Sequence, residues 1–382
     1  MPSYALVTSQ LLMIAVFLGL TATGGAQTYT ILHNFQGLDG RYPYASVTLG
    51  PAGDIYGVAD WGGKYGSGDI FRIAPSGQFY SIDLPRAKGR GPIGTLARDA
   101  AGNFFGTTVL GGRSNCGTVF ELKSHSAEVV FNALSDVGYP RAGLVLGSAG
   151  NLFGTATLAG AFNKGGIFKI THSGKFSLLH SFNPIADGYG AWGLVRDSSG
   201  TLYGANAYGG RHGNGTVFSL DTSGKFRVLY AFTGGSDGGT PDAGLMIDSQ
   251  GTLYGTTGGG GGSAGVVFKL DNKGTETVLY SFDGIVGDGP LGPLVSDDQG
   301  NLFGTTIGGG LYDSGTVFQL DPEGNLTVLH NFDRSTGDGL TPYAGLVRDS
   351  LGNLYGTTYY GGNGPCSEAG YLGCGIVFEL TP

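Results

Sequence analysis

Aromatic side chains close to small polar residues are the first candidates for chemistry in this sequence. Both tryptophans lie in such segments: Trp61 and Tyr65 in "DWGGKYG", and Tyr189 and Trp192 in "GYGAWGLV". Rings of this kind can stack on the apolar faces of sugars, while neighbouring Asp, Asn and Lys side chains bind hydroxyl groups. The sequence leaves two interpretations open for these four residues, a ligand site or packing beneath long loops.

One segment is basic where related segments are acidic. In "RAKGRG", Arg86, Lys88 and Arg90 occupy a loop whose six counterparts carry Asp. The three cations can neutralise neighbouring carboxylates, which we favour, or form a subsite for an anionic ligand. Arg86 and Arg90 are therefore further candidates for ligand binding. With a net charge of -8 and no longer basic run, the chain is not expected to bind nucleic acid.

Aspartates recur in the loops that join the repeated segments. They are Asp39, Asp136, Asp187, Asp237, Asp288 and Asp338. A ring of carboxylates could bind calcium, which takes about six to eight oxygen ligands, and Asp187, Asp237, Asp288 and Asp338 are the metal candidates. Because no D-x-D-x-D-G loop is present, we favour Asp-Gly turn chemistry and expect no bound cofactor.

Catalytic motifs are not evident. Three histidines, His33, His180 and His330, share a repeat position that Tyr or Phe fills elsewhere, so we interpret them as aromatic strand residues. "GGSAG" at 261–265 matches a nucleophile motif, but the strand-to-helix context that this motif needs is missing. The six glutamates are scattered, which gives little basis for paired-carboxylate catalysis.

The three cysteines differ in their expected states. Cys366 and Cys374 bracket "SEAGYLG", an insertion in the last repeat, and can form a disulfide in an oxidising compartment. Cys116 has the same repeat position as Cys374 in a distant repeat, beyond the limit of about 7 Å for bridged Cα atoms. We expect Cys116 to be a buried or lone thiol.

A repeated segment must position all of these residues. The pattern G-x-[LFI]-[YF]-G occurs seven times, beginning at Gly53, Gly102, Gly150, Gly200, Gly251, Gly300 and Gly352. Each copy is surrounded by four short runs of β-branched and aromatic residues, such as "AGLMID", "TLYGTT", "GVVFKL" and "ETVLYSF", and turn residues separate the runs. Four strands in about fifty residues are typical of a β-propeller blade.

The two ends of the repeated region predict how the ring closes. The seventh copy stops after "GIVFELTP" and lacks its fourth strand, whereas "TYTILHNF" at 28–35 matches the fourth strand "LTVLHNF" at 326–332. The sequence therefore predicts an all-β, single seven-bladed propeller with four antiparallel strands per blade. In this fold the N-terminal strand completes the last blade.

Residues 1–26 have the features of a signal peptide. They carry no charged side chain, contain the apolar run Leu11–Leu20, and end with small residues at Gly24 and Ala26. An uncleaved anchor is the alternative. We expect residues 27–382 to form a secreted monomer, extracellular or periplasmic, with no membrane span once the signal is removed.

With these motifs in view, the chain resembles the GloVer-type tandem-repeat proteins, which are exported bacterial proteins with runs of "GNLYGTT…GG…GTVFxL". The resemblance covers residues 28–382, and "GLVxDxxGNLYGTT" is also similar to NHL-type propeller repeats. Many family members continue into a surface anchor, whereas this sequence ends at the repeat. The resemblance implies a fold and export, but no established activity.

Two functions follow from these observations. The leading hypothesis is a non-catalytic exported propeller that binds a polysaccharide or a partner protein through its long-loop face. This face holds the "GG" loops and the loops that lead into the next blade. The alternative is a metal-assisted hydrolase, lyase or lactonase with its site at the mouth of the central channel, where the Asp loops would supply carboxylates.

Overall fold

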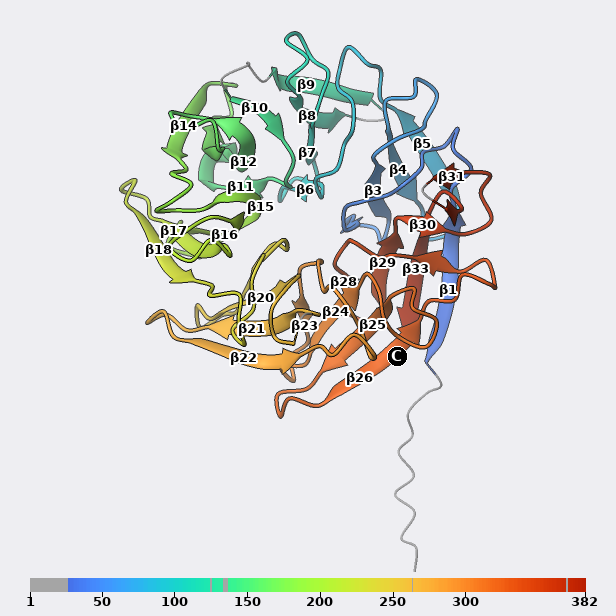
Figure 1. The fold of residues 1–382 in the computed structure, drawn as a ribbon. Coiled ribbons are helices and arrows are strands. Elements are labelled where there is room, and N and C mark those ends of the chain that lie inside the picture. Colours follow the sequence, from blue (N-terminus) through green and yellow to red (C-terminus); the bar gives the residue numbers. More distant parts are fainter. Residues whose placement is uncertain (1–26, 124–125, 133–136, 263, 369) are drawn as a thin grey trace, which may run out of the picture.

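The computed structural model describes residues 27–123, 126–132, 137–262, 264–368 and 370–382. Its strands form seven sheets arranged in a ring (Figure 1), so the predicted seven-bladed propeller is confirmed. The proposed signal peptide, residues 1–26, and Asp136 lie outside the described residues. Among the described residues, the one helical element is the short 3-10 turn Ser148–Gly150.

Each blade is a meander of four antiparallel strands, numbered from the channel outward. The first three blades contain β2 (Thr48–Leu49), β3 (Ile55–Ala59), β4 (Asp69–Ile73) and β5 (Phe79–Asp83); β6 (Ala97–Arg98), β7 (Phe104–Thr108), β8 (Thr118–Lys123) and β9 (Ser126–Asn132); and β11 (Val145–Leu146), β12 (Leu152–Ala159), β13 (Gly166–Ile170) and β14 (Phe176–Ser181). A fifth strand, β10 (Val137–Pro140), also pairs with β12 in blade three.

The remaining blades keep this order. They contain β15 (Tyr189–Arg196), β16 (Leu202–Tyr208), β17 (Thr216–Leu220) and β18 (Phe226–Ala231); β19 (Met246–Ile247), β20 (Leu253–Thr257), β21 (Val266–Leu270) and β22 (Glu276–Ser281); β23 (Val295–Ser296), β24 (Leu302–Thr306), β25 (Thr316–Leu320) and β26 (Leu326–Asn331); and β28 (Val347–Arg348), β29 (Leu354–Thr358), β33 (Ile376–Thr381) and β1 (Thr28–Asn34). Two short pairs lie outside the blades: β27 (Gly339–Leu340) with β30 (Tyr360–Gly361), and β31 (Ser367–Glu368) with β32 (Tyr371–Leu372).

The repeated motif "GTT" is explained by packing within a blade and by a hydrogen bond between blades. The glycine faces a phenylalanine of the next strand: a Cβ on Gly304 would lie 2.6 Å from Phe318, closer than real Cβ atoms approach. The first threonine hydrogen bonds to the next blade, as Thr305 does when its hydroxyl donates to the Ala344 carbonyl at 2.8 Å. The motif therefore determines the close contact within a blade and the hydrogen bond between neighbouring blades.

The ring closes as predicted, through the N-terminal strand. β1 pairs antiparallel with β33, from Thr28 opposite Thr381 to Asn34 opposite Ile376. In Figure 1, β1, drawn in blue, lies beside β33, drawn in red. The hydrogen bond from threonine to the next blade is also present between blades seven and one, where the Thr357 hydroxyl donates to the Ala45 carbonyl at 3.1 Å.

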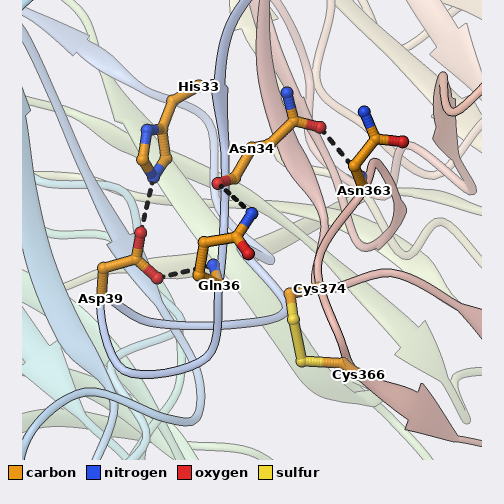
Figure 2. Close-up of a disulfide and its surroundings, with 7 residues drawn as sticks. All are labelled: His33, Asn34, Gln36, Asp39, Asn363, Cys366 and Cys374. Atoms are coloured by element: carbon orange, nitrogen blue, oxygen red, sulfur yellow. Dashed lines mark hydrogen bonds and ion pairs between the residues drawn. A yellow bond between two sulfur atoms is a disulfide. The ribbon is translucent and has the colours of Figure 1, made fainter.

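A disulfide lies beside the closing joint. Cys366 and Cys374 are bonded, with their Cα atoms 5.0 Å apart, whereas Cys116 is a free, buried thiol. Figure 2 shows the disulfide near the segment that follows β1, where the Asn363 amide donates to Asn34 Oδ1 at 3.0 Å. The insertion in the last blade is thus tied to that blade and hydrogen bonded to the N-terminal strand.

Candidate functional site

The long-loop end of the central channel opens into a cavity with a volume of about 350 Å³. Each of the seven blades contributes to its lining, from the segment that precedes or begins the innermost strand. Its aromatic and charged lining comes from five of the blades: Tyr44, Arg141, Trp192, Asp242 and Tyr343. We call this set the mouth residues; each of the five directly precedes a small residue, Ala or Gly.

Trp192 lies in a β-bulge of the innermost strand of blade four. Ala191 pairs with Asn206 and Leu194 pairs with Gly204, so Trp192 and Gly193 together face the single residue Ala205. The Thr155 hydroxyl donates to the Ala191 carbonyl, as the Thr107 hydroxyl donates to the Ala142 carbonyl of blade three. Trp192 therefore belongs to a β-bulge, a feature that redirects side chains.

Trp192 connects the aromatic and charged parts of the mouth. Its indole Nε1 donates a hydrogen bond to Asp242 Oδ1 at 3.1 Å. Its ring stacks on Tyr44 with centroids 6.0 Å apart, and the Arg141 guanidinium lies 6.0 Å from its centroid. These contacts hold a half-buried indole in one orientation at the cavity wall, as a stacking platform requires.

Tyrosines form the wall opposite. Tyr44 and Tyr343 stack with centroids 5.1 Å apart, and Tyr359 packs edge-on against both. Burial raises the pKa of Tyr44 to about 12, with further contributions from neighbouring Tyr343 and Asp242. The tyrosines therefore remain neutral at physiological pH and can donate or accept hydrogen bonds through their hydroxyl groups.

Two carboxyl groups near the mouth are less acidic than usual. Burial raises the pKa of Asp242 to about 6, although the hydrogen bond from Trp192 opposes the shift. Burial likewise raises the pKa of Asp60 to about 6, against the effects of Trp61 and Arg141. Such carboxyls can accept hydrogen bonds from hydroxyl groups when ionised and donate one when protonated.

A second cavity, of about 280 Å³, adjoins the mouth between blades three and four. Arg141 and Trp192 line both cavities. The second cavity is also lined by Tyr189, Tyr208 and Lys164. We call it the side groove. The structure thus places two of the predicted ligand residues, Trp192 and Tyr189, in one continuous concave region.

The other predicted ligand residues lie elsewhere. Trp61, 42% exposed, pairs through its backbone with Arg41. Arg86 donates from Nε to the Tyr65 carbonyl at 3.2 Å, and Arg90 pairs through its backbone with Leu110. None of Trp61, Tyr65, Arg86 and Arg90 lines the mouth cavity or the side groove. The six predicted residues therefore form two separate groups.

The basic loop does make the ionic contact expected of it. Lys88 Nζ lies 3.1 Å from Glu128 Oε1 on the outermost strand of blade two. The same ammonium group donates to the Ser126 hydroxyl at 3.1 Å. This part of the loop thus neutralises a neighbouring acid, which is the interpretation that the sequence favours for it.

The recurring aspartates face their own blades, at the outer rim of the propeller. Asp187 Oδ2 is 2.9 Å from His180 Nε2 and accepts the Asn183 amide at 2.9 Å. Asp237 accepts from the Tyr230 hydroxyl at 3.0 Å in the same manner. Their carboxylates complete turns, instead of meeting in a ring around the channel. Asp288 is exposed, and its backbone pairs with Gly308.

Two further copies of this contact lie at the closing joint. His33 Nε2 is 2.9 Å from Asp39 Oδ2, as Figure 2 shows, and His330 Nε2 is 2.8 Å from Asp338 Oδ2. Asp338 also accepts the Tyr29 hydroxyl at 2.5 Å, which links it to the N-terminal strand. The histidines are strand residues as interpreted, but the sequence analysis missed their aspartate partners, which follow six to eight residues later.

Sequence reasoning also missed Tyr44, Arg141, Asp242 and Tyr343. All four directly precede the alanine that opens a repeat, in "YAS", "RAG", "DAG" and "YAG", so variation at this one position was an available signal. Among the described residues, no three or more His, Cys, Asp and Glu side chains gather as a metal site. Within the same ranges, no helix is long and apolar enough to cross a membrane.

Solved structures similar to this one are propellers of low sequence identity. A virginiamycin B lyase from Staphylococcus aureus has a TM-score of 0.61 at 14% identity, with 93% of this chain and 99% of that chain covered. An oligogalacturonate lyase from Vibrio parahaemolyticus has a TM-score of 0.59 at 11% identity, with coverages of 92% and 93%. At these identities the similarity concerns the fold alone.

The extracellular domain of a larger protein shares the fold as well. The extracellular domain of a hybrid two-component system from B. thetaiotaomicron has a TM-score of 0.61 at 13% identity, and the match covers 93% of this chain and 39% of that chain. No curated protein matches the chain in sequence.

A family model matches almost the whole repeated region. The Gloeobacter/Verrucomicrobia repeat aligns with residues 16–191 and again with residues 173–370. This match confirms the resemblance seen in the sequence. The chain belongs to the Gloeobacter/Verrucomicrobia repeat family.

Proposed function

We propose that this protein is an exported propeller that binds an extracellular polysaccharide at the mouth of its central channel. The observation that carries the proposal is the β-bulge that places Trp192 beside Tyr44, Arg141 and Asp242. An aromatic platform with adjacent hydrogen-bonding groups in a concave site is suited to a sugar ring, which has apolar faces and a hydroxyl edge.

Export is supported by two findings. The Cys366–Cys374 disulfide is the kind of bond that persists in oxidising compartments. A structurally similar propeller is the extracellular domain of a two-component system. Cleavage of residues 1–26 remains part of the proposal, and the N-terminal sequence of the exported protein tests it.

The metal-assisted hydrolase or lyase receives less support from the geometry. Its motive was a ring of carboxylates, but Asp187, Asp237 and Asp338 each hydrogen bond within the rim. A partner protein is the other ligand class that the sequence indicates. A pull-down with the same variants used for glycans distinguishes that class.

A glycan array with the purified protein tests the proposal. We expect binding to a polysaccharide class, a loss of at least tenfold in affinity for Trp192→Ala, and unchanged affinity for Trp61→Ala. The second variant is the matched control because Trp61 lies outside both cavities. Absence of glycan binding, or equal binding by Trp192→Ala, would contradict the proposed site.

A further inference from the structure

The channel mouth and the side groove are suited to different parts of one ligand. They share Arg141 and Trp192, so a chain molecule seated in the mouth can continue into the groove without leaving the surface. Trp192 can contact one unit from each cavity. The two cavities differ, however, in the charged groups that they present.

The charged side chains that line the mouth include a carboxyl group, whereas those that line the groove are all cationic. Asp242 lines the mouth and accepts the Trp192 indole hydrogen bond, with Arg141 as the cation nearby. The groove is lined by Arg141 and Lys164, and no Asp or Glu is among its lining residues. In a protein with a net charge of -8, this local excess of positive charge is unusual.

Both groove cations are available to a ligand. Arg141 and Lys164 are exposed, and within the described part of the chain neither forms an ion pair. Each instead lies against a ring, with Lys164 Nζ 4.6 Å from the Tyr189 centroid and the Arg141 guanidinium 6.0 Å from the Trp192 centroid. Asp60 is the acid whose titration Arg141 affects, and it lines neither cavity.

We propose that the polysaccharide is acidic, with one sugar seated in the mouth and an adjacent sugar, which carries an anionic group, seated in the groove between Lys164 and Arg141. Tyr189, Tyr208 and Trp192 supply the aromatic surface of this second subsite. A guanidinium fork binds a carboxylate through two parallel hydrogen bonds, and an ammonium group adds a point charge. This inference rests on the proposed glycan binding.

The test compares oligosaccharides of equal length by isothermal titration calorimetry on the full chain. One set contains uronates, a second is the same set with its carboxyl groups reduced to alcohols, and a third is sulfated. We expect an anionic chain to bind at least tenfold more tightly than the reduced chain in low salt, and the difference to shrink as salt is added. A uronate preference and a sulfate preference identify which anionic group the groove binds, and either supports the inference.

Two variants locate the effect. Lys164→Gln, which changes the groove alone, is expected to weaken binding of the anionic chain about fivefold and to leave the reduced chain unchanged, which corresponds to the loss of one exposed charged contact. Arg141→Gln, which changes the mouth as well, is expected to weaken binding of both chains, and that of the anionic chain by the larger factor. Lys175 is an exposed lysine at the opposite end of blade three. Lys175→Gln is therefore the matched control and should change the affinity for neither the anionic nor the reduced chain.

The outcomes separate this inference from the proposed function. If anionic and reduced chains bind equally well, and the binding depends on Trp192, glycan binding stands and the acidic ligand is wrong. An anionic preference that persists unchanged in both Lys164→Gln and Arg141→Gln also overturns the inference, because the selectivity then lies elsewhere. If no oligosaccharide binds, the inference and the proposed function fail together.

Discussion

At the outer rim the same contact recurs from blade to blade, whereas at the channel mouth the blades contribute different residues. Asp187, Asp237 and Asp338 all pair with a ring on the outermost strand of their blade. Arg141, Trp192 and Asp242 come from three successive blades and supply a cation, an aromatic ring and a carboxyl group. The comparison indicates that repeated residues in this propeller specify folding, and that departures from the repeat specify binding.

The largest effect is expected where the rim contact also fastens the ring. Asp338 is buried and accepts hydrogen bonds from Tyr29, His330 and the Gly339 amide. Asp338→Ala leaves these donors without a partner, and we expect it to lower the free energy of unfolding by about 3 kcal/mol. Urea unfolding followed by fluorescence measures the loss.

The control for Asp338→Ala is the same substitution at Asp288. That residue lies in the corresponding loop between blades, two positions later in the repeat, where its backbone pairs with Gly308 as the backbone of Leu340 pairs with Tyr360. It is exposed, and among the described residues its carboxylate makes no side-chain hydrogen bond. Asp288→Ala should change stability by less than about 0.5 kcal/mol. Equal losses in the two variants would contradict the assignment of the rim contact.

A smaller effect is expected from the disulfide beside the closing joint. The Cys366–Cys374 bond encloses a short loop, with a sequence separation of 8. Reduction should lower the unfolding free energy by about 2 kcal/mol, since it restores freedom to the unfolded chain. The measurement compares unfolding with and without dithiothreitol; the double variant Cys366→Ala/Cys374→Ala should show no response to the reductant.

The mouth should respond to pH with the opposite sign to the rim. For Asp338, burial is outweighed by the hydrogen bonds from His330 and Tyr29, and its pKa lies below the ordinary value. Its contribution is complete above the unfolded pKa of about 4 and is lost as the pH falls through the lower folded value. For Asp242 the folded pKa is raised to about 6, so its contribution is present below about pH 4 and is lost as the pH rises through 6.

Asp242→Asn tests this difference in sign. The amide oxygen can still accept the Trp192 hydrogen bond, but the charge is removed. We expect the variant to be about 1 kcal/mol more stable than wild type at pH 8 and equal to it near pH 4, after allowance for partial exposure. Unfolding midpoints in a pH series measure the difference; a variant that is less stable at pH 8 would show that the mouth carboxylate is structural.

The fold was predictable because the same pattern of strands and turns recurs in every blade. Short apolar runs, turn residues and the match of 28–35 to 326–332 were sufficient for blade number and for closure. The His–Asp contacts were not foreseen, since the loop has to fold back before His180 can reach Asp187. The sequence alone does not specify that curvature.

The candidate site was predictable only in part. Trp192 and Tyr189 were predicted as ligand residues because aromatic side chains of this kind are not part of the common repeat. Arg141 and Asp242 are ordinary residues about a hundred positions apart, and they meet Trp192 only because the ring directs the start of every blade to one axis. Conversely, Trp61 is also a tryptophan but lies outside the mouth. Residue type alone therefore does not predict how close a side chain lies to the channel axis.

The most direct test removes the β-bulge of blade four. Deletion of Trp192 converts "GAWGLV" to "GAGLV" and leaves Gly193 alone opposite Ala205, which removes the bulge from the pairing of β15 with β16. Calorimetric titration with the glycan identified for wild type is expected to show at least a hundredfold loss of affinity while the free energy of unfolding stays within about 1 kcal/mol of wild type. Retained binding in a folded deletion variant would contradict the account that the bulge of blade four makes the binding site.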